Sequence, residues 1–337
     1  MKKLFSWLLK AFAAGLLAFV VLTLFCTLYY NVPVHYSNTD GSTDYSWEKN
    51  KFYSRGTEGF ACGRTNNEGY LNTYDYLDGM DIDVLIMGSS HIEAYNVSPS
   101  ESTSCRLDAL LEDETIYNIG MSGHNFLVCS NNLEHALKKY KPRQYVIIET
   151  SILLFDENAV ENAAEGTMDE LPSYSGGIIG MLQKNQFLRL LYSQFSNWKP
   201  EPKHDNATNL QPLQLTNTHK QSYLKLLNKL SQTAADYGVQ LIVLYHSNIQ
   251  IDSKTGKALK DSSEFTNFFA AYCETTGITF VDMSERFKAE YDEKHILPHG
   301  FANTSIGTGH LNKHGHRMIA EELFEIIGSE DECHLHH

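Results

Sequence analysis

Hydrophobic and polar positions divide this chain into three unlike parts. A charge-free and largely apolar run occupies residues 11–30, and an irregular polar stretch follows over 31–80. From residue 81 onward, short apolar runs alternate with segments whose apolar residues recur at helical spacing. The alternation predicts a parallel sheet covered on both faces by helices.

The alternating part resolves into five predicted strands and five predicted helices. The strands are expected over 83–87, 115–119, 144–148, 239–245 and 279–282. The helices are expected over 104–111, 126–140, 219–237, 262–275 and 313–327. In the second of these helices the stripe expected to be buried is Leu127, Leu133, Ala136 and Leu137.

Residues 155–215 interrupt this rhythm. They contain four prolines, and only the piece near 182–195 has helical spacing. The stretch is too long for an ordinary loop, so we interpret it as an insertion in a single domain over 81–330. Excursions of this kind often form lids or binding walls.

The apolar run over 11–30 has the length of a membrane-spanning helix, which needs about twenty residues. Lys2, Lys3 and Lys10 come at or before its start, which favours a cytoplasmic N-terminus. A cleaved signal peptide is the alternative, but the run ends without an Ala-x-Ala-like site. We therefore predict a single-pass cell-membrane protein, with an anchor over 1–30, a stem over 31–80 and an extracytoplasmic domain.

Charge and cysteine content limit the choice of partners and compartment. The chain has 27 basic and 41 acidic residues; without the three lysines of 1–30 the counts are 24 and 41, a formal charge of −17. This acidity argues against a nucleic-acid partner, whose phosphates need a basic face. Five of the six cysteines lie outside the anchor with no Cys-x-x-Cys, so disulfides and scattered thiols both stay open.

The clearest candidate for chemistry follows the first predicted strand, where an apolar run gives way to Gly88, Ser89, Ser90 and His91. Parallel α/β folds bind their ligands at the carboxyl ends of strands. A serine becomes a nucleophile when a base takes its proton, and His310, just ahead of the last helix, is a suitable base. The alternative is that the two serines only cap the following turn.

Four segments stand in order at predicted strand ends or before the last helix: 88–91, 117–123, 142–149 and 310–316. Together they resemble the SGNH (GDSL-like) hydrolase superfamily, and most of all its membrane-anchored bacterial members associated with acylation of cell-surface polymers. The resemblance spans 83–327 apart from the insertion. It implies a doubly wound, flavodoxin-like sheet of about five parallel strands.

The resemblance also implies roles for single residues. Ser90 matches the serine of the Gly-Asp-Ser motif and would be the nucleophile, with His310 as its base. The backbone N–H groups of Ser90 and Gly123 would hold the oxyanion. The family's third donor is an asparagine after the third strand, and here that place reads Glu149, Thr150 and Ser151, so Thr150 or Ser151 would have to donate.

A second departure from the family pattern concerns the acid that orients the base. The usual aspartate three residues before the catalytic histidine is replaced by Gly307. A backbone carbonyl or an acid from elsewhere would then have to hold the imidazole of His310. Residues considered for orienting the base or contacting the substrate are His91, Glu149, Asp282 and Asn312.

These features predict an extracytoplasmic serine enzyme for O-acetyl transfer or ester hydrolysis on a cell-envelope polysaccharide, with a membrane-bound O-acyltransferase as partner. The altered aspartate and asparagine positions support an alternative, a glycan-binding or assembly protein on the same fold. No cofactor is expected. No metal site is expected either, because the histidines of the polar tail over 331–337 lack a defined four-ligand arrangement.

Overall fold

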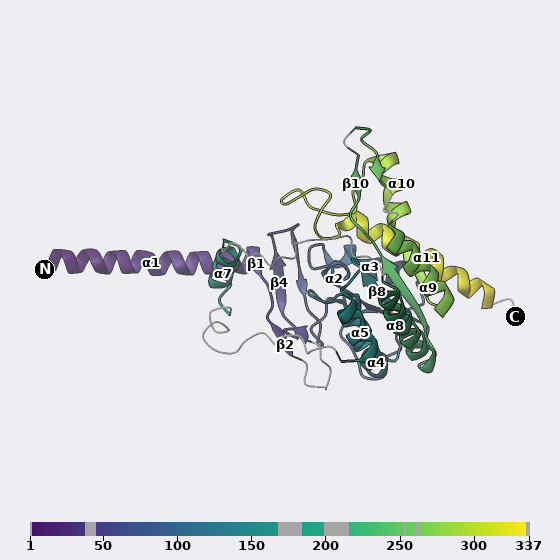
Figure 1. Ribbon diagram of the computed structural model, residues 1–337. Helices are drawn as coiled ribbons and strands as arrows, with labels where there is room; N and C mark the ends of the chain where they lie inside the picture. Colours follow the sequence, from purple (N-terminus) through teal and green to yellow (C-terminus); the bar gives the residue numbers. More distant parts are fainter. Residues whose placement is uncertain are drawn as a thin grey trace.

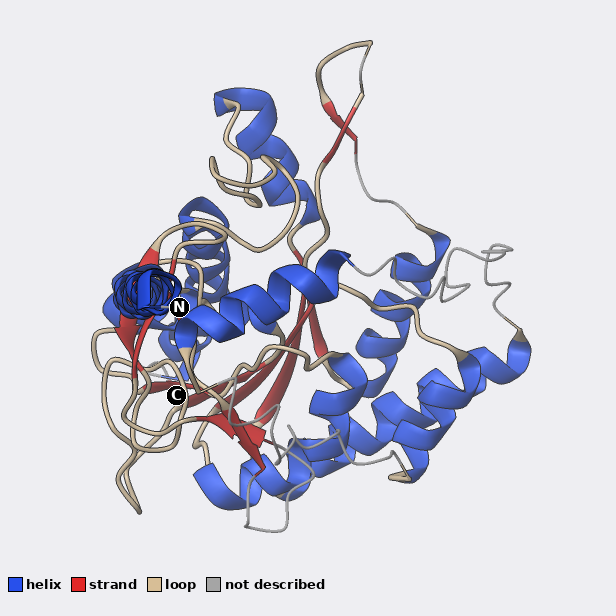
Figure 2. Ribbon diagram, turned by 90° about the vertical axis from the view of Figure 1, so that its left-hand side faces the viewer, coloured by secondary structure: helices blue, strands red, loops and turns tan. Residues whose placement is uncertain are grey.

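The computed structural model of the protein describes residues 2–37, 45–167, 184–198, 216–252, 254–259 and 263–334. Helix α1 (Lys2–Tyr29) extends from an α/β body that contains the other elements (Figure 1). The body is built on a five-stranded sheet with helices on both faces (Figure 2).

All neighbouring strands of this sheet pair in parallel, in the order β12-β9-β8-β6-β7. The strands are β6 (Val84–Met87), β7 (Ile116–Asn118), β8 (Tyr145–Thr150), β9 (Gln240–Tyr245) and β12 (Thr279–Asp282). The chain runs outward from β6 to β7, then returns to the other side of β6 and continues outward. This order confirms the predicted doubly wound fold, and its switch point lies between β6 and β8, where such folds bind ligands.

Two apolar cores fill the space between the sheet and its helices. The principal helices are α3 (Thr103–Leu110), α4 (Phe126–Tyr140), α8 (Asn217–Asp236), α9 (Glu264–Thr276), α10 (Ser284–Lys294) and α11 (Lys313–His334). One core joins α4, α8 and α9 to the sheet through residues such as Leu133, Leu227 and Phe269. The other contains Leu107 of α3 and Leu323 of α11. The predicted stripe of α4 is buried as expected.

Residues 31–80 differ from the irregular stem that the sequence predicts. They form a three-stranded antiparallel sheet, β1 (Tyr30–Asn31), β4 (Phe52–Arg55) and β5 (Ala61–Arg64), and a pair, β2 (His35–Ser37) with β3 (Tyr45–Trp47). Trp47, Tyr53 and Tyr70 are buried in the larger core. Strands this short leave almost no periodic pattern in the sequence, which is why the sequence did not predict them. Single buried aromatic residues attach the segment to the domain.

The insertion contains two described helices, α5 (Glu157–Glu165) and α7 (Gln186–Trp198); its residues 168–183 and 199–215 lie outside the described part. The sequence did not predict α10 or the hairpin of β10 (Gln250–Ile251) and β11 (Ala258–Leu259). Helix α11 continues into the predicted polar tail. Cys62, Cys105 and Cys273 are thiols, not halves of disulfides.

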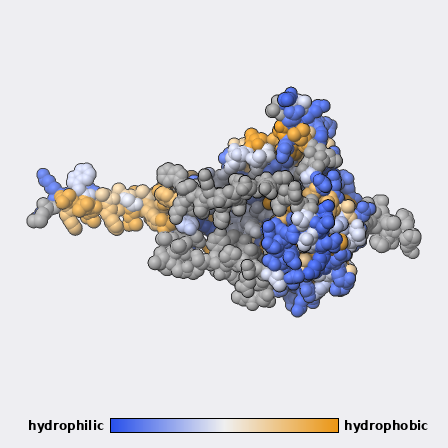
Figure 3. Space-filling view, viewed as in Figure 1, coloured by the Kyte–Doolittle hydropathy of each residue, from blue (hydrophilic) through white to orange (hydrophobic). Residues whose placement is uncertain are grey.

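Helix α1 is long and apolar enough to cross a membrane, with a mean hydropathy of 2.4 over 18 residues. Only 6% of that window is buried, which excludes a core helix, whereas a signal sequence would meet the same criteria. In the space-filling view its surface is hydrophobic along most of its length (Figure 3).

Candidate active site

Ser90 lies at the carboxyl end of β6, where the chain turns into the short helix α2 (Ser90–Glu93). Ser89 is the N-cap of that helix, and its hydroxyl oxygen accepts a hydrogen bond from the N–H of His91. The hydroxyl of Ser90 lies 2.9 Å from Nε2 of His310. Ser89 is therefore the cap of the turn, and the hydroxyl of Ser90 is free of that role and faces His310.

His310 is held by a carboxylate that the sequence did not suggest, Glu58. The distance from His310 Nδ1 to Glu58 Oε2 is 2.6 Å, and the backbone N–H of His310 donates to Oε1 at 3.0 Å. An ionised carboxylate only accepts, so Nδ1 carries the proton and Nε2 presents its lone pair to Ser90. This is the tautomer that a general base requires.

The Glu58 carboxylate is ionised at neutral pH. Burial acts to raise its pKa, but hydrogen bonds from the side chain and backbone of His310 outweigh that effect and the pKa falls to about 2. A fixed negative charge at this position would stabilise an imidazolium if His310 took up a proton. The side chains of His310 and Glu58 are 27% and 16% exposed, so the site stays open to solvent.

The acids proposed from the sequence do not orient His310. The Asp282 carboxylate accepts hydrogen bonds from the N–H and hydroxyl of Ser284. Asn312 donates to the carbonyls of Leu297 and Gly300 and so shapes the loop that leads to His310. Glu58 stands 252 positions from His310 in the chain. Its only local signal was an acid close to two glycines, Gly56 and Gly59, which is too common to identify it.

Gly307 stands where the SGNH hydrolases usually have an aspartate, so placing an aspartate there tests whether Glu58 already performs that role. Its φ of +87° is strained for any other residue, and a Cβ there would lie 3.3 Å from Leu297 Cδ1. Since Glu58 already holds His310, Gly307→Asp is expected to lower kcat/KM for an acetyl ester. Gly307→Asn, which has nearly the same shape and meets the same backbone strain, should lower it equally. A higher rate for the aspartate variant would mean that His310 lacks an effective acid.

Glu149 has a different position, beside Ser89 in the turn that carries Ser90. It is fully buried, and its Oε2 accepts the N–H of Ser89 at 2.8 Å as well as the Ser89 hydroxyl. Its other oxygen lies 2.8 Å from Nε2 of His246. Burial raises the pKa of Glu149. The carboxylate anchors the turn that carries Ser90, and it does not act as an oxyanion donor when ionised.

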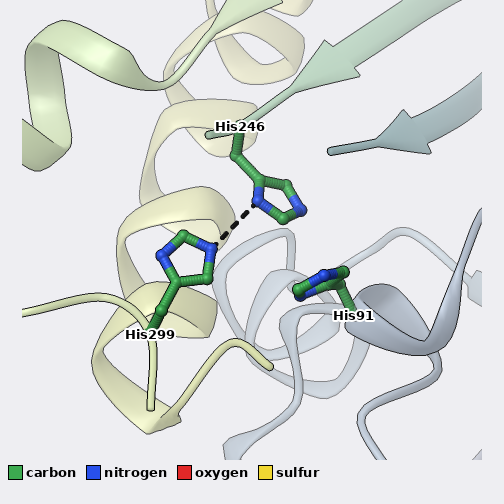
Figure 4. A group of neighbouring side chains, drawn as sticks. All are labelled: His91, His246 and His299. Carbon is green, nitrogen blue, oxygen red and sulfur yellow. Dashed lines mark hydrogen bonds between the residues drawn. The ribbon is translucent and has the colours of Figure 1, made fainter. Parts of the chain in front are cut away.

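Three histidines, His91, His246 and His299, gather under this turn (Figure 4). Burial lowers the pKa of His91 and His246 to about 3 and that of His299 to about 2, so the rings are neutral. One nitrogen from each lies within 4.8 Å of the others, a composition that could hold a metal ion.

Hydrogen bonds occupy part of each ring, whereas Nδ1 of His299 is buried without a hydrogen-bond partner among the described residues. Nδ1 of His91 accepts the N–H of Leu311, so its Nε2 carries the proton and the ring has no free lone pair. Nδ1 of His246 and Nε2 of His299 share a hydrogen bond of 3.2 Å. We describe the group as a polar network that supports Glu149. The sequence did not single out His246 or His299, and its expectation of no metal site stays a prediction.

The predicted oxyanion residues have different surroundings. Gly123 is exposed, has a φ of +92°, and follows Ser122, whose hydroxyl donates to the buried Glu93. The hydroxyl of Thr150 instead donates to the carbonyl of Ile152 at 2.6 Å, within its own turn. The hydroxyl proton of Thr150 is therefore used within its own turn and does not point to an oxyanion role. The oxyanion roles of Ser90, Gly123 and Ser151 stay predictions.

Glu93 also accepts a hydrogen bond from the indole N–H of Trp47. Burial raises the pKa of this carboxyl. Trp47 belongs to 31–80, as Glu58 does, so this segment contributes both to the base and to the support of the turn at Gly123.

No family model matches the chain, and no curated protein matches it. Among solved structures, the chain is similar to the YXIM protein of Bacillus subtilis, at 9% identity and a TM-score of 0.43, over 79% of this chain and 60% of that one. It is similar to the acetyl xylan esterase AlAXEase, at 13% identity and 0.42, over 73% of this chain and 100% of that one. It is also similar to a lipolytic protein of the G-D-S-L family from Veillonella parvula, at 17% and 0.39, over 73% and 97%.

Proposed function

We propose that this protein is a serine-dependent esterase or O-acyltransferase that acts on O-acetyl groups of a cell-envelope polysaccharide. The observation that carries the proposal is the continuous hydrogen-bonded chain from Ser90 through His310 to Glu58. A nucleophile, a base and an acid in this order are the parts that acyl transfer requires.

The reaction follows from the tautomer of His310. Nε2 takes the proton of the Ser90 hydroxyl as Oγ attacks the acyl carbon, and Glu58 stabilises the resulting imidazolium. The imidazolium then gives the proton to the departing alcohol, which leaves an acyl-enzyme. A second hydroxyl, from water or a sugar, loses its proton to His310 as it attacks the acyl carbon. The bond between the acyl carbon and Ser90 Oγ then breaks, and His310 returns the proton to Oγ.

The contacts between α1 and the body support a retained anchor and, with it, an extracytoplasmic, membrane-anchored site. The end of α1 is built into the folded body: Cys26 is 1% exposed, and the Ser54 hydroxyl donates to the carbonyl of Thr27 at 3.2 Å. A segment removed by a signal peptidase would not have such a place in the core. With a cytoplasmic N-terminus, the domain would face the cell envelope, where a membrane-bound O-acyltransferase could supply the acyl group.

Labelling tests the nucleophile. The full chain in detergent is incubated with a fluorophosphonate, and the modified peptide is identified by mass spectrometry. We expect the adduct on Ser90, none in Ser90→Ala, and continued labelling in Ser89→Ala. A folded wild-type protein that stays unlabelled would favour the glycan-binding alternative.

A second assay addresses the substrate. Acetate release from an O-acetylated cell-wall polysaccharide is compared with acetyl transfer from p-nitrophenyl acetate to the deacetylated polymer, with Ser90→Ala as the blank. Either activity supports the proposal and says whether water or a sugar resolves the acyl-enzyme. Turnover of p-nitrophenyl acetate alone would contradict the polysaccharide substrate.

A further inference from the structure

Helix α7 packs against the apolar helix α1 near its C-terminal end (Figure 1). The rings of Phe187 and Phe19 are 6.0 Å apart, and the amide of Asn185 donates to the Thr23 hydroxyl at 3.3 Å. Phe187 lies in the first turn of α7, and Asn185 directly precedes the helix. Figure 1 shows α7 crossing the axis of α1 and not running alongside it.

The composition of α7 suits a position in an apolar layer. Its sequence, QFLRLLYSQFSNW, contains one charged residue, Arg189. That guanidinium donates to the backbone carbonyls of Val32 and Pro33, directly after β1. Its charge therefore lies against the backbone of the folded body. Farther along the helix, Leu191 is 36% exposed and Tyr192 is 52% exposed.

The depth in the bilayer of the contact between α1 and α7 determines whether α7 also contacts lipid. If the charge-free run over 11–30 spans the bilayer, Thr23 lies seven residues before its outer end. At 1.5 Å per residue this is a depth of about 10 Å. Helices that lie in the plane of a membrane bury their apolar face to about 5–10 Å, at the boundary of headgroups and acyl chains. The lipid that surrounds this part of α1 would therefore also contact α7.

The same end of α1 is joined to the candidate active site. In the small sheet, Tyr30 pairs with Arg55, and a Cβ on Gly56 would lie 2.5 Å from the ring of Tyr29. Glu58 is two residues farther on, so its Cα lies within about 7 Å of that of Gly56. The acid that holds His310 thus lies next to the chain's exit from the membrane.

We propose that α7 is an interfacial helix whose exposed side lies in the lipid of the domain-side leaflet. Together with α1 it gives the body two points of attachment, and it holds the site of Ser90 and His310 close to the bilayer surface. The attachment itself does not depend on the proposed acyl chemistry.

Photochemical crosslinking in lipid tests the proposal with the full chain. Benzoylphenylalanine replaces Tyr192 in protein reconstituted into nanodiscs of phosphatidylcholine and phosphatidylglycerol, and lipid adducts are measured by mass spectrometry. Leu22 of α1, which is 41% exposed, is the positive control site, and Tyr237 at the end of α8, which is 38% exposed, is the matched control outside the membrane. We expect the adduct yield at 192 to approach that at 22 and to exceed that at 237 by about tenfold.

A yield at 192 as low as that at 237, with strong labelling at 22, would overturn the proposal. Absence of lipid adducts at both 22 and 192 would overturn it as well, because α1 would then not span the bilayer. Turnover of a soluble acetyl ester by the same three proteins reports the proposed function separately, and it should equal that of the wild type.

Discussion

Glu58→Gln is expected to lower kcat for a soluble acetyl ester by about 10⁴-fold, with a much smaller change in KM. Glutamine preserves the size of the side chain but removes the charge that stabilises the His310 imidazolium. Its amide can also favour the wrong imidazole tautomer, with the lone pair turned away from Ser90. Steady-state kinetics of the purified full chain near neutral pH measure the effect.

Asp282→Asn is the matched control, because the sequence alone makes Asp282 as reasonable an orienting acid as any other. Its kcat should stay close to that of the wild type. Glu58→Asp should lie between the two, since a shorter carboxylate keeps the charge but not the two hydrogen bonds to His310. A large loss in Asp282→Asn together with a small one in Glu58→Gln would refute the assignment of the triad.

Acidification below about pH 6.5 is expected to destabilise the domain steeply. Burial lowers the pKa of His91, His246 and His316 to about 3 and that of His299 to about 2, whereas an unfolded histidine has a pKa of about 6.5. Between these values the unfolded chain binds more protons than the folded one, so the free energy of unfolding falls as the pH falls. Each such histidine contributes about 1.4 kcal/mol per pH unit.

Two buried carboxyl groups act in the opposite direction. Burial raises the pKa of Glu93 and Glu149, so their protonated forms favour the folded state as the pH falls. These two groups reduce the slope below the limit set by the four histidines, which is an uptake of about four protons on unfolding, or about 5 kcal/mol per pH unit. Urea unfolding at several pH values between about 7.5 and 5 measures this slope.

Substitution of single histidines tests whether they cause the change with pH in the free energy of unfolding. His246→Gln should reduce the slope by about one proton, whatever its effect on stability at neutral pH. His295→Asn replaces an exposed histidine in a left-handed position that asparagine tolerates, and it is the control for a substitution outside the buried cluster. A slope that is the same in wild type and His246→Gln would show that His246 does not remain neutral in the folded protein.

The sequence determined the α/β architecture, because buried strands and amphipathic helices leave strong periodic signals. It predicted helix 126–140 with the bounds that the structure shows, and strand 83–87 within one residue. It also selected Ser90, which follows a buried strand, and His310, which precedes the last helix, because both match motifs of the SGNH hydrolases that the sequence resembles. The structure brings these two side chains within 2.9 Å.

Only the tertiary structure decided which acid completes the site and how the polar stretch after α1 folds. Strands of two to four residues have no measurable period, and one carboxylate among 41 acidic residues carries no sign of its partner. Glu58 meets His310 because Tyr30 pairs with Arg55 and because Asn303 donates to the carbonyls of Gly56 and Gly59. Such contacts depend on distances between remote parts of the chain, which local patterns of hydrophobicity do not encode.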